Sequence, residues 1–204
     1  MATALCVSGY QNLAYGQDSL TKIRQETQNL ARQYAEVDAM LADTDKNKRI
    51  GAMVALIKSD DPIFQKRARE VGLFSPDPEM RMLALQATLN SGGPFRIDVA
   101  LQGADEKQTF MQKWIERVHG SRSADGAFAQ YIFSTSSYNS EAQCWQMRGD
   151  RNCVIKRAGE TLSFNWGAGY ASFTLSTDGR LIGSIRYSFN SFKGIAVPAQ
   201  INLI

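Results

Sequence analysis

The chain has 204 residues, of which 44% are hydrophobic and 21% are charged, and its formal net charge is +3. This composition is typical of a folded globular protein, and no apolar run reaches the roughly 18 residues needed to span a bilayer. The positive charge is spread thinly, because residues 95–204 hold 12 Lys and Arg against 9 Asp and Glu without a basic cluster. We therefore expect no nucleic-acid partner, since binding to phosphates requires a basic patch or stripe.

The first 16 residues allow two interpretations. Ala14-Tyr15-Gly16 fits the small-x-small pattern that precedes a signal-peptide cleavage site, and no acidic residue comes before Asp18. However, no Lys or Arg comes before Lys22, and polar residues interrupt the apolar stretch. Residues 1–16 are therefore interpreted as a truncated or mis-started leader of an exported protein, with a disordered N-terminus of a cytoplasmic protein as the alternative.

An apolar stripe with alternating spacings of three and four follows this segment. Its members are Leu20, Ile23, Thr27, Leu30, Tyr34, Val37 and Leu41. The stripe predicts a helix of about 25 residues with one apolar face. The residues that flank it do not form the complementary charge pairs typical of a coiled coil. We therefore expect this helix to pack on its own chain, with self-association through residues 20–41 as the alternative.

Three similar blocks come next, each beginning sixteen residues after the last, at Asp45, Asp61 and Asp77. An Asp can cap the N-terminus of a helix, and the Pro that follows it in the second and third blocks suits the first helical position. The blocks predict three short helices of similar length.

The segment DPEMRMLALQATL resembles the helix signature of HEAT-type repeats in four residues: Asp77, Pro78, Arg81 and Ala84. The resemblance covers residues 43–91 and implies a scaffold or a protein-binding surface. HEAT units pair two helices over about 40 residues, so the shorter spacing leaves a small helical bundle as an alternative. Arg49 and Arg81 are expected to pair with Asp residues of neighbouring helices.

Residues 90–94, with two Gly and one Pro, end the helical region. Alternating apolar residues then predict a strand from residue 95, and residues 105–119 predict a helix that Gly120 ends. Nearly all later segments predict short antiparallel strands, typical of a sandwich or a partly closed barrel. The expected fold is thus α+β: a helical, HEAT-like region at 17–91 and a β-sandwich-like domain at 95–204 with one packed helix.

Two cysteines bracket the segment CWQMRGDRNC. If Arg148 and Gly149 form a hairpin turn, Cys144 faces Cys153 and a disulfide can close; a register shifted by one residue would place Cys153 opposite Gln146 instead. Removing residues 1–16 would also discard Cys6 and leave an even pair, which favours an oxidising compartment. A disulfide is therefore predicted, with free buried thiols as the alternative.

Signatures of catalysis are scarce. His119 is the only histidine, and the chain has no phosphate-binding loop, no zinc-protease motif and no nucleophile elbow. No cofactor, metal site or catalytic residue is predicted. A hydrolase that works with two carboxylates remains open.

Aromatic residues are the best candidates for a binding site. A face of exposed rings on a β-domain can stack on a sugar or a peptide, although such rings are often core residues. We single out Trp145, Trp166 and Tyr170. The sequence thus predicts a non-catalytic binding or scaffold protein, periplasmic or extracellular, that recognises a protein or a glycan. A dedicated glycan-binding module, a carboxylate-dependent hydrolase and a cytoplasmic location are the alternatives.

Overall fold

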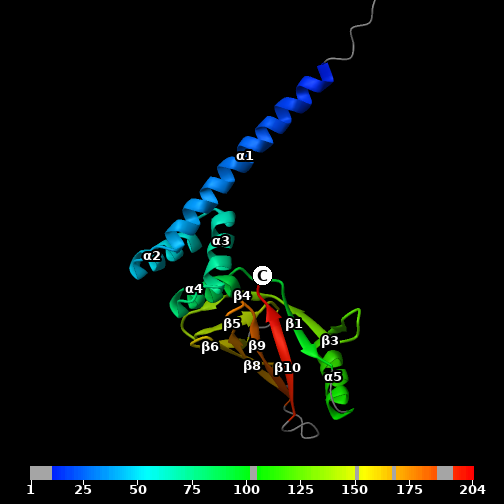
Figure 1. Ribbon diagram of the computed structural model, residues 1–204. Helices are drawn as coiled ribbons and strands as arrows, with labels where there is room; N and C mark the ends of the chain where they lie inside the picture. The colour runs from blue at the N-terminus through cyan, green and yellow to red at the C-terminus, as the bar shows by residue number, and fades with distance from the viewer. Residues whose placement is uncertain (1–10, 102–104, 150–151, 167–168, 188–194) are drawn as a thin grey trace, which may run out of the picture.

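The computed structural model describes residues 11–101, 105–149, 152–166, 169–187 and 195–204. Four helices come first, and a ten-stranded antiparallel sheet with one further helix follows (Figure 1). This confirms the α+β class. The helices of the described residues are α1 (Gln11–Leu41), α2 (Lys46–Ile57), α3 (Pro62–Leu73), α4 (Pro78–Asn90) and α5 (Asp105–Val118).

The described strands pair as a single sheet in the order β2-β3-β1-β10-β9-β8-β7-β6-β5-β4, whereas a sandwich would divide them between two sheets. From β4 to β10 each strand pairs with the next one along the chain, and β10 pairs with β1. The strands are β1 (Phe95–Ala100), β2 (Ser121–Arg122), β3 (Phe128–Phe133), β4 (Thr135–Asn139), β5 (Cys144–Met147), β6 (Cys153–Ala158), β7 (Thr161–Asn165), β8 (Gly169–Leu175), β9 (Leu181–Tyr187) and β10 (Ala196–Asn202).

The sheet curls until strands from its two ends meet. Ser134 alone separates β3, which is second in the order, from β4 at the opposite edge. The backbone N–H of Arg148 donates to the carbonyl of Ser134 at 2.7 Å. Across the inside of the curl, the rings of Phe133 on β3 and Phe164 on β7 lie 5.6 Å apart between centroids. The inward-facing side chains therefore form one closed apolar core.

Helices α2, α3 and α4 begin where the repeated Asp residues predict. Asp45, Asp61 and Asp77 are the N-caps, and their carboxylates accept hydrogen bonds from backbone N–H groups of the first helical turn. A proline follows the cap of α3 and of α4. The predicted sixteen-residue periodicity of helix starts is therefore confirmed, since each cap satisfies donors that a helix leaves unpaired.

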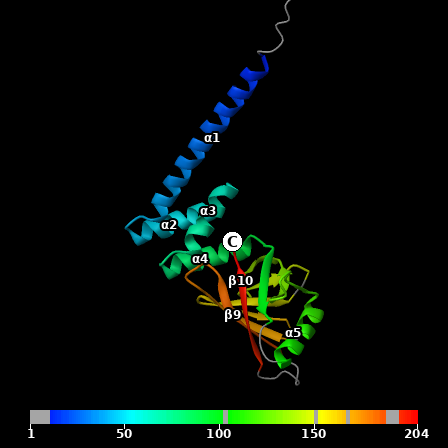
Figure 2. The same ribbon diagram turned by 45° about the vertical axis from the view of Figure 1, so that its right-hand side comes forward.

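Helix α1 packs on the chain only near its C-terminal end. Val37 and Leu41 are 2% and 3% exposed, whereas Leu20 and Ile23 are 56% and 55% exposed. All side chains from residue 18 to residue 29 are exposed. In both views α1 points away from the sheet as a rod (Figures 1 and 2). The expectation that this helix packs on its own chain therefore holds for its C-terminal part and fails for residues 18–29.

The reason is one of length. Helix α1 has 31 residues, whereas α2 and α3 have 12 each. At 1.5 Å per residue these lengths correspond to about 46 Å and about 18 Å. The shorter helices therefore cover only the part of α1 next to them, and its other end has no neighbour among the described residues.

Helix α5 packs against the sheet through Trp114, which is 2% exposed and meets the ring of Tyr131 edge-on at 6.2 Å. Its end differs from the prediction, because His119 and not Gly120 has the left-handed conformation, with φ of 54°. Gly120 is required for another reason: a Cβ there would lie 2.6 Å from the carbonyl oxygen of Gln130 on β3. The glycine permits close approach of the helix end to the sheet.

Polar contacts join the helical region to the sheet. Arg81 on α4 pairs with Glu160, between β6 and β7, and its Nε donates to the carboxylate at 2.8 Å. The expected pairing of Arg81 with an Asp is thus wrong. Thr135 at the start of β4 donates its hydroxyl to the carbonyl of Leu89, and its backbone N–H donates to Gly92 at 3.0 Å. The buried apolar residues accordingly form one cluster that runs through both regions.

Candidate functional site

The three aromatic residues that we singled out do not form a common surface. Trp145 on β5 is 0% exposed, and its indole Nε1–H donates to Asn90 Oδ1 at 2.8 Å. Its ring lies against Tyr138, with 4.6 Å between centroids. Trp145 is therefore a core residue that ties α4 to the sheet, and it offers no ring face to a ligand.

Trp166 and Tyr170 lie on opposite faces of the sheet. Along β7 and β8 the buried and exposed residues alternate, and Tyr170 is on the exposed face, with 52% of its surface accessible. Trp166 continues the buried face and stacks on Phe164, with 5.4 Å between ring centroids. Because successive residues of a strand point to opposite faces, the two rings cannot contact the same ligand.

The predicted cysteine pair is close enough for a disulfide. Cys144 and Cys153 are bonded, with 5.5 Å between their Cα atoms. The register is the one that we expected to prevent the bond, because Cys153 pairs with Gln146. The register changes between Trp145 and Gln146, where β6 contains one extra residue, Val154, and the two cysteines are bonded across this irregular pairing.

A different site stands out, a groove of about 950 Å³ near the end of α1 and the start of α4. Its floor is apolar and it opens between the C-terminal end of α1, the C-terminal half of α3 and the start of α4. Apolar side chains dominate its lining: Leu41, Val71, Phe74, Met80 and Ile204. Its volume lies near the upper end of the roughly 300–1,000 Å³ usual for ligand pockets. We call it the junction groove.

Phe74 forms the outer wall of the junction groove. It is 54% exposed although it follows directly after α3. Its ring packs against the turn between β8 and β9, where a Cβ on Gly179 would lie 3.1 Å from the ring. Gly179 has φ of 75°, the left-handed conformation that glycine adopts in such tight hairpin turns. The hairpin thus fixes the position of an exposed ring at the edge of the groove.

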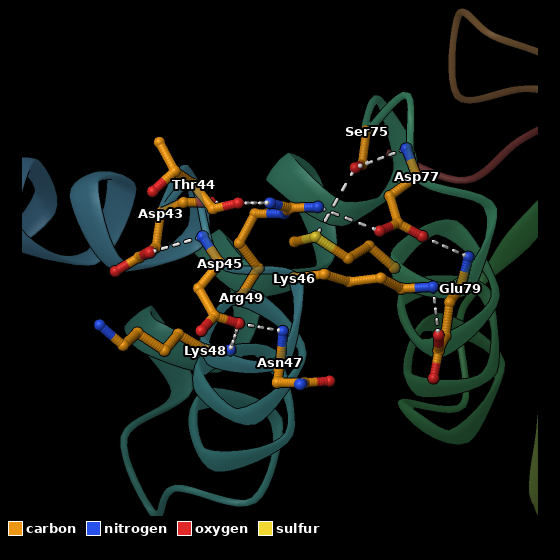
Figure 3. A network of polar contacts seen from close by, with 11 residues as sticks. Asp43, Thr44, Asp45, Lys46, Asn47, Lys48, Arg49, Ser75, Asp77 and Glu79 are labelled. Carbon is orange, nitrogen blue, oxygen red and sulfur yellow. Dashed lines mark hydrogen bonds and ion pairs between the residues drawn. The ribbon is translucent and has the colours of Figure 1, made fainter.

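Arg49 on α2 holds one rim of the groove together (Figure 3). One guanidinium nitrogen donates to the carbonyls of Asp43 and Thr44 at 2.8 and 3.1 Å, and the other lies 3.3 Å from the carboxylate of Asp77. Next to this cluster, Lys46 and Glu79 pair at 3.0 Å. The segment after α1 is thereby tied to the N-cap of α4, and the predicted pairing of Arg49 with an Asp is confirmed.

Asp77 is a largely buried carboxylate of this rim, since its side chain is only 12% exposed. Burial raises the pKa of Asp77, but the hydrogen bond from the backbone N–H of Glu79, the charge of Lys46 and the hydrogen bond from Arg49 outweigh this effect. The pKa of Asp77 therefore lies below its ordinary value, and the group stays ionised at neutral pH.

Arg67 on α3 forms the other rim. Its guanidinium donates twice to the carboxylate of Asp38 on α1, at 2.8 and 2.6 Å, and lies 3.8 Å from Glu70. The same guanidinium lies over the ring of Tyr34 at 5.8 Å. The hydrogen bond with Asp38 is the main cause of the raised pKa of Arg67. Both arginines at the groove are thus already paired with carboxylates.

The carboxylates at the groove are bound to structural partners. Asp43, Glu70 and Asp77 line it together, but Asp43 accepts a backbone hydrogen bond from Asp45 at 2.8 Å, and Glu70 faces Arg67. A general acid needs a raised pKa, whereas that of Asp77 is lowered. This arrangement does not favour acid–base catalysis.

Three carboxylates of residues 95–204 are likewise paired with arginines. Asp98 pairs with Arg96, Glu160 with Arg81, and Asp178 with Arg180. Hydrogen bonds with Arg180 and Ser176 lower the pKa of Asp178. Within the described ranges, no group of three or more His, Cys, Asp or Glu residues is placed to hold a metal ion. Nor does any described helix have the length and apolar character needed to cross a membrane.

Sequence reasoning missed the junction groove because its walls come from distant parts of the chain. Leu41 and Ile204 lie far apart in the sequence, yet they line the same space. One local signal was present: Phe74 is a large apolar residue between a helix end and a Ser-Pro turn, where a buried position is not expected. Comparison with known protein families, curated proteins and solved structures finds no match for this chain.

Proposed function

We propose that the protein is a non-catalytic binding protein that recognises an apolar segment of another protein in the junction groove. The observation that carries this proposal is the groove itself, about 950 Å³ in volume with an apolar floor. Such a space suits one or two large side chains of a partner segment. Because Arg49 and Arg67 are paired with carboxylates, an apolar segment fits better than a strongly charged one.

Helices α2, α3 and α4 act as the scaffold in this proposal. They have 12, 12 and 13 residues and start with equivalent Asp caps, which supports the HEAT-like interpretation of residues 43–91. The β-domain, a single curled sheet, serves as the rigid base, and its contacts with α4 and Phe74 hold the walls of the groove in place. A surface built on rigid elements loses little freedom when a partner binds.

Selection of random peptides on phage tests this function. Peptides are selected on the disulfide-bonded protein. Their affinity for the wild type, Phe74→Ala and Ile132→Ala is then measured by fluorescence anisotropy. Both substitutions remove an exposed apolar side chain, 54% and 66% exposed, but only Phe74 lies at the groove. We expect Phe74→Ala to weaken binding about tenfold, a loss of roughly 1.4 kcal/mol, and Ile132→Ala to leave it unchanged. Equal binding by both variants, or no enriched peptide, would overturn the proposal.

We further propose that the protein works outside the cytoplasm, in the periplasm or the extracellular space. The proximity of Cys144 and Cys153 supports this location, because disulfides persist in oxidising compartments. A leader within residues 1–16 is part of the same proposal. Residues 1–10 lie outside the described residues and residues 11–16 belong to α1, so cleavage before Gln17 would shorten this helix.

The intact mass of the protein from its native cells, with and without reductant, tests the location. We expect a species that lacks the leader and is two hydrogens lighter than its reduced form. A full-length, reduced chain would show that the protein is cytoplasmic, which is the alternative.

Self-association through residues 20–41 is a second candidate. The exposure of Leu20 and Ile23, 56% and 55%, favours it, because an apolar stripe with coiled-coil spacing is left without cover among the described residues. Sedimentation equilibrium over a wide concentration range tests it. We expect Ile23→Glu to abolish any association and Gln25→Glu, which lies off the stripe, to have no effect. A wild-type chain that stays monomeric would exclude this candidate.

The remaining alternatives have less support. A glycan-binding module would have to rely on the exposed ring of Tyr170, since Trp145 is buried and Trp166 belongs to the other face of the sheet. A carboxylate-dependent hydrolase would need a protonated carboxyl group near the groove, whereas the pKa of Asp77 is lowered. A protein partner therefore remains the leading proposal.

A further inference from the structure

A second, polar cavity of about 200 Å³ lies at the other end of the helical region. It opens to solvent between the C-terminal ends of α2 and α4 and the middle of α3. The residues that line it are Ile57, Gln65, Arg69, Ala87, Asn90 and Ser91. None of them lines the junction groove, so the two sites are separate.

Arg69 brings a positive charge to this cavity without a matching negative one. Within the described residues, no carboxylate lies at ion-pair distance from Arg69, and no hydrogen bond is formed by its guanidinium. In contrast, Arg49, Arg67 and Arg81 of the same helical region each pair with a carboxylate. Arg69 is half-buried and its guanidinium still meets water, so its N–H donors are available to a ligand.

The surroundings of Arg69 make this charge effective. Burial lowers the pKa of Arg69, and the charge of Glu70 offsets only part of this effect. Glu70 is itself shared between Lys66 and Arg67, at 3.7 and 3.8 Å. A guanidinium that is partly removed from water and still charged attracts an anion more strongly than a solvated one.

Asn90 supplies a second donor with a fixed orientation. The indole of Trp145 can only donate, so the atom of Asn90 that it contacts at 2.8 Å must be the side-chain oxygen. The side-chain NH₂ of Asn90 is then left to bond elsewhere, and no hydrogen bond of this group is formed within the described residues. Asn90 also lines the cavity. The buried Trp145 thus sets the amide so that two N–H donors remain for a ligand.

The end of α4 would repel an anion if its carbonyl groups were free. Three of its last four carbonyl groups accept hydrogen bonds from donors of the protein. The carbonyl of Ala87 accepts from the backbone N–H of Ser91 at 3.0 Å, and that of Thr88 accepts from the Ser91 hydroxyl at 2.7 Å. The carbonyl of Leu89 accepts from Gly92 at 3.2 Å and from the hydroxyl of Thr135. The nearby donors of Arg69 and Asn90 therefore dominate the polarity of the cavity.

We infer that this cavity binds a small oxyanion, held by the guanidinium of Arg69 and the side-chain NH₂ of Asn90. The planar fork of an arginine matches the two oxygens of a carboxylate or a phosphate, and an asparagine NH₂ can donate to one of them. At about 200 Å³ the cavity is smaller than the roughly 300 Å³ where pockets for drug-sized ligands begin, so it suits a compact group. The site is independent of peptide binding in the junction groove.

Thermal unfolding of the full, disulfide-bonded chain tests this inference. Sodium acetate, sodium succinate and sodium phosphate are compared with sodium chloride at equal ionic strength. We expect at least one oxyanion to raise the Tm by about 3–5 °C when its concentration is ten times its Kd. Acetate and succinate without phosphate would identify a carboxylate ligand, phosphate alone would identify a phosphate ligand, and all three would identify a general oxyanion site.

Three variants assign the effect to the cavity. Arg69→Met keeps the length of the side chain and removes its charge, and Arg32→Met removes the same charge from the exposed side of α1. Asn90→Asp keeps an oxygen for Trp145 but replaces the NH₂ donor by a second oxygen. We expect Arg69→Met and Asn90→Asp to lose the rise in Tm and Arg32→Met to keep it. Without oxyanion, Arg69→Met should melt no lower than the wild type, because it removes a charge that has no partner.

A structural role for Arg69 gives different results. In that case Arg69→Met melts below the wild type without any oxyanion. If this variant does not fold, Asn90→Asp decides the question. The inference is overturned if no oxyanion raises the wild-type Tm above the chloride control, or if Asn90→Asp keeps the full rise.

Discussion

The two ends of α1 have the same pattern of apolar residues and opposite surroundings. At the C-terminal end Val37 and Leu41 are 2% and 3% exposed, whereas Leu20 and Ile23 near the other end are 56% and 55% exposed. All of them belong to one stripe with alternating spacings of three and four. Periodicity therefore identifies the apolar face of a helix, but the length of the neighbouring helices decides how much of that face is covered.

The difference between covered and uncovered positions recurs in the helical region. Gly72 and Gly51, Asp77 and Asp61, and Asp38 and Asp18 are chemically equal pairs with unequal surroundings. In each pair only the first residue contacts a neighbouring helix at the junction. Matched substitutions can therefore measure what the neighbouring helices contribute.

The largest effect is expected for truncation of the α1 stripe. Leu41→Ala should lower the free energy of unfolding by about 2–5 kcal/mol, because it leaves a cavity between α1 and its neighbours. Leu20→Ala should change it by less than about 0.5 kcal/mol, because the side chain is already in water. Urea unfolding of both variants measures the difference.

A large loss of unfolding free energy in Leu20→Ala would contradict this expectation. It would mean that the N-terminal part of α1 is covered in solution, as in a dimer. Repeating the measurement at several protein concentrations identifies that case, because the stability of a dimer depends on concentration.

The next effect concerns two glycines in helices. A Cβ on Gly72 of α3 would lie 2.6 Å from Ala84 Cβ and closer still to Met53, whereas a Cβ on Gly51 of α2 would have no neighbour within 4 Å. We expect Gly72→Ala to destabilise the protein by about 1–3 kcal/mol through overpacking. Gly51→Ala should stabilise it by about 0.5–1 kcal/mol, because alanine is the better helix former.

Thermal unfolding of the two glycine variants checks these signs. Two stabilised variants would show that α3 and α4 can move apart at no cost. Two destabilised variants would show that α2 is strained at Gly51, where the structure has open space.

Local patterns in the sequence predicted the starts of the helices correctly. Asp45, Asp61 and Asp77 act as caps through hydrogen bonds within their own first turns, so nothing outside the segment is needed to predict them. The disulfide was predicted as well, but with another register, because the irregular pairing of β5 with β6 has no signal in the sequence. Features that depend on a few neighbouring residues are thus readable from sequence.

Features that depend on distant residues were not readable. Trp145 belongs to the core because α4 presents Asn90 to it across a sequence separation of 55 residues. The junction groove requires Leu41, Phe74 and Ile204 to meet, and no local pattern specifies that meeting. Arg81 pairs with Glu160 rather than with an Asp for the same reason, since the separation is 79 residues.

A smaller effect is expected for the caps of α4 and α3. Asp77→Asn keeps an N-cap oxygen but removes the charge that pairs with Arg49, and we expect a loss of about 1 kcal/mol at neutral pH. Asp61 caps α3 without an ion pair among the described residues, so Asp61→Asn should cost less. Urea unfolding at neutral pH measures both.

The pH dependence of this loss follows from the pKa of Asp77. Because the folded-state pKa of Asp77 is lowered, its charge stabilises the protein above the unfolded pKa of about 4, and the contribution is lost as the pH falls through the lower folded value. The difference between the wild type and Asp77→Asn should therefore shrink below about pH 4. A difference that persists unchanged to lower pH would assign it to the geometry of the cap instead of its charge.

The smallest effect is expected for the ion pair that fastens α1 to α3. Asp38 accepts two hydrogen bonds from Arg67, but the two side chains are 41% and 34% exposed, so water screens much of their attraction. Asp38→Asn should cost about 0.5 kcal/mol, and Asp18→Asn, on the uncovered part of the helix, should cost nothing measurable.

The two variants are compared by urea unfolding at low and high salt. The Asp38 effect should decrease at high salt, because an exposed pair is screened. An effect that salt leaves unchanged would mean that the position of the Arg67 guanidinium over the Tyr34 ring, and not the ion pair with Asp38, holds α1 in place.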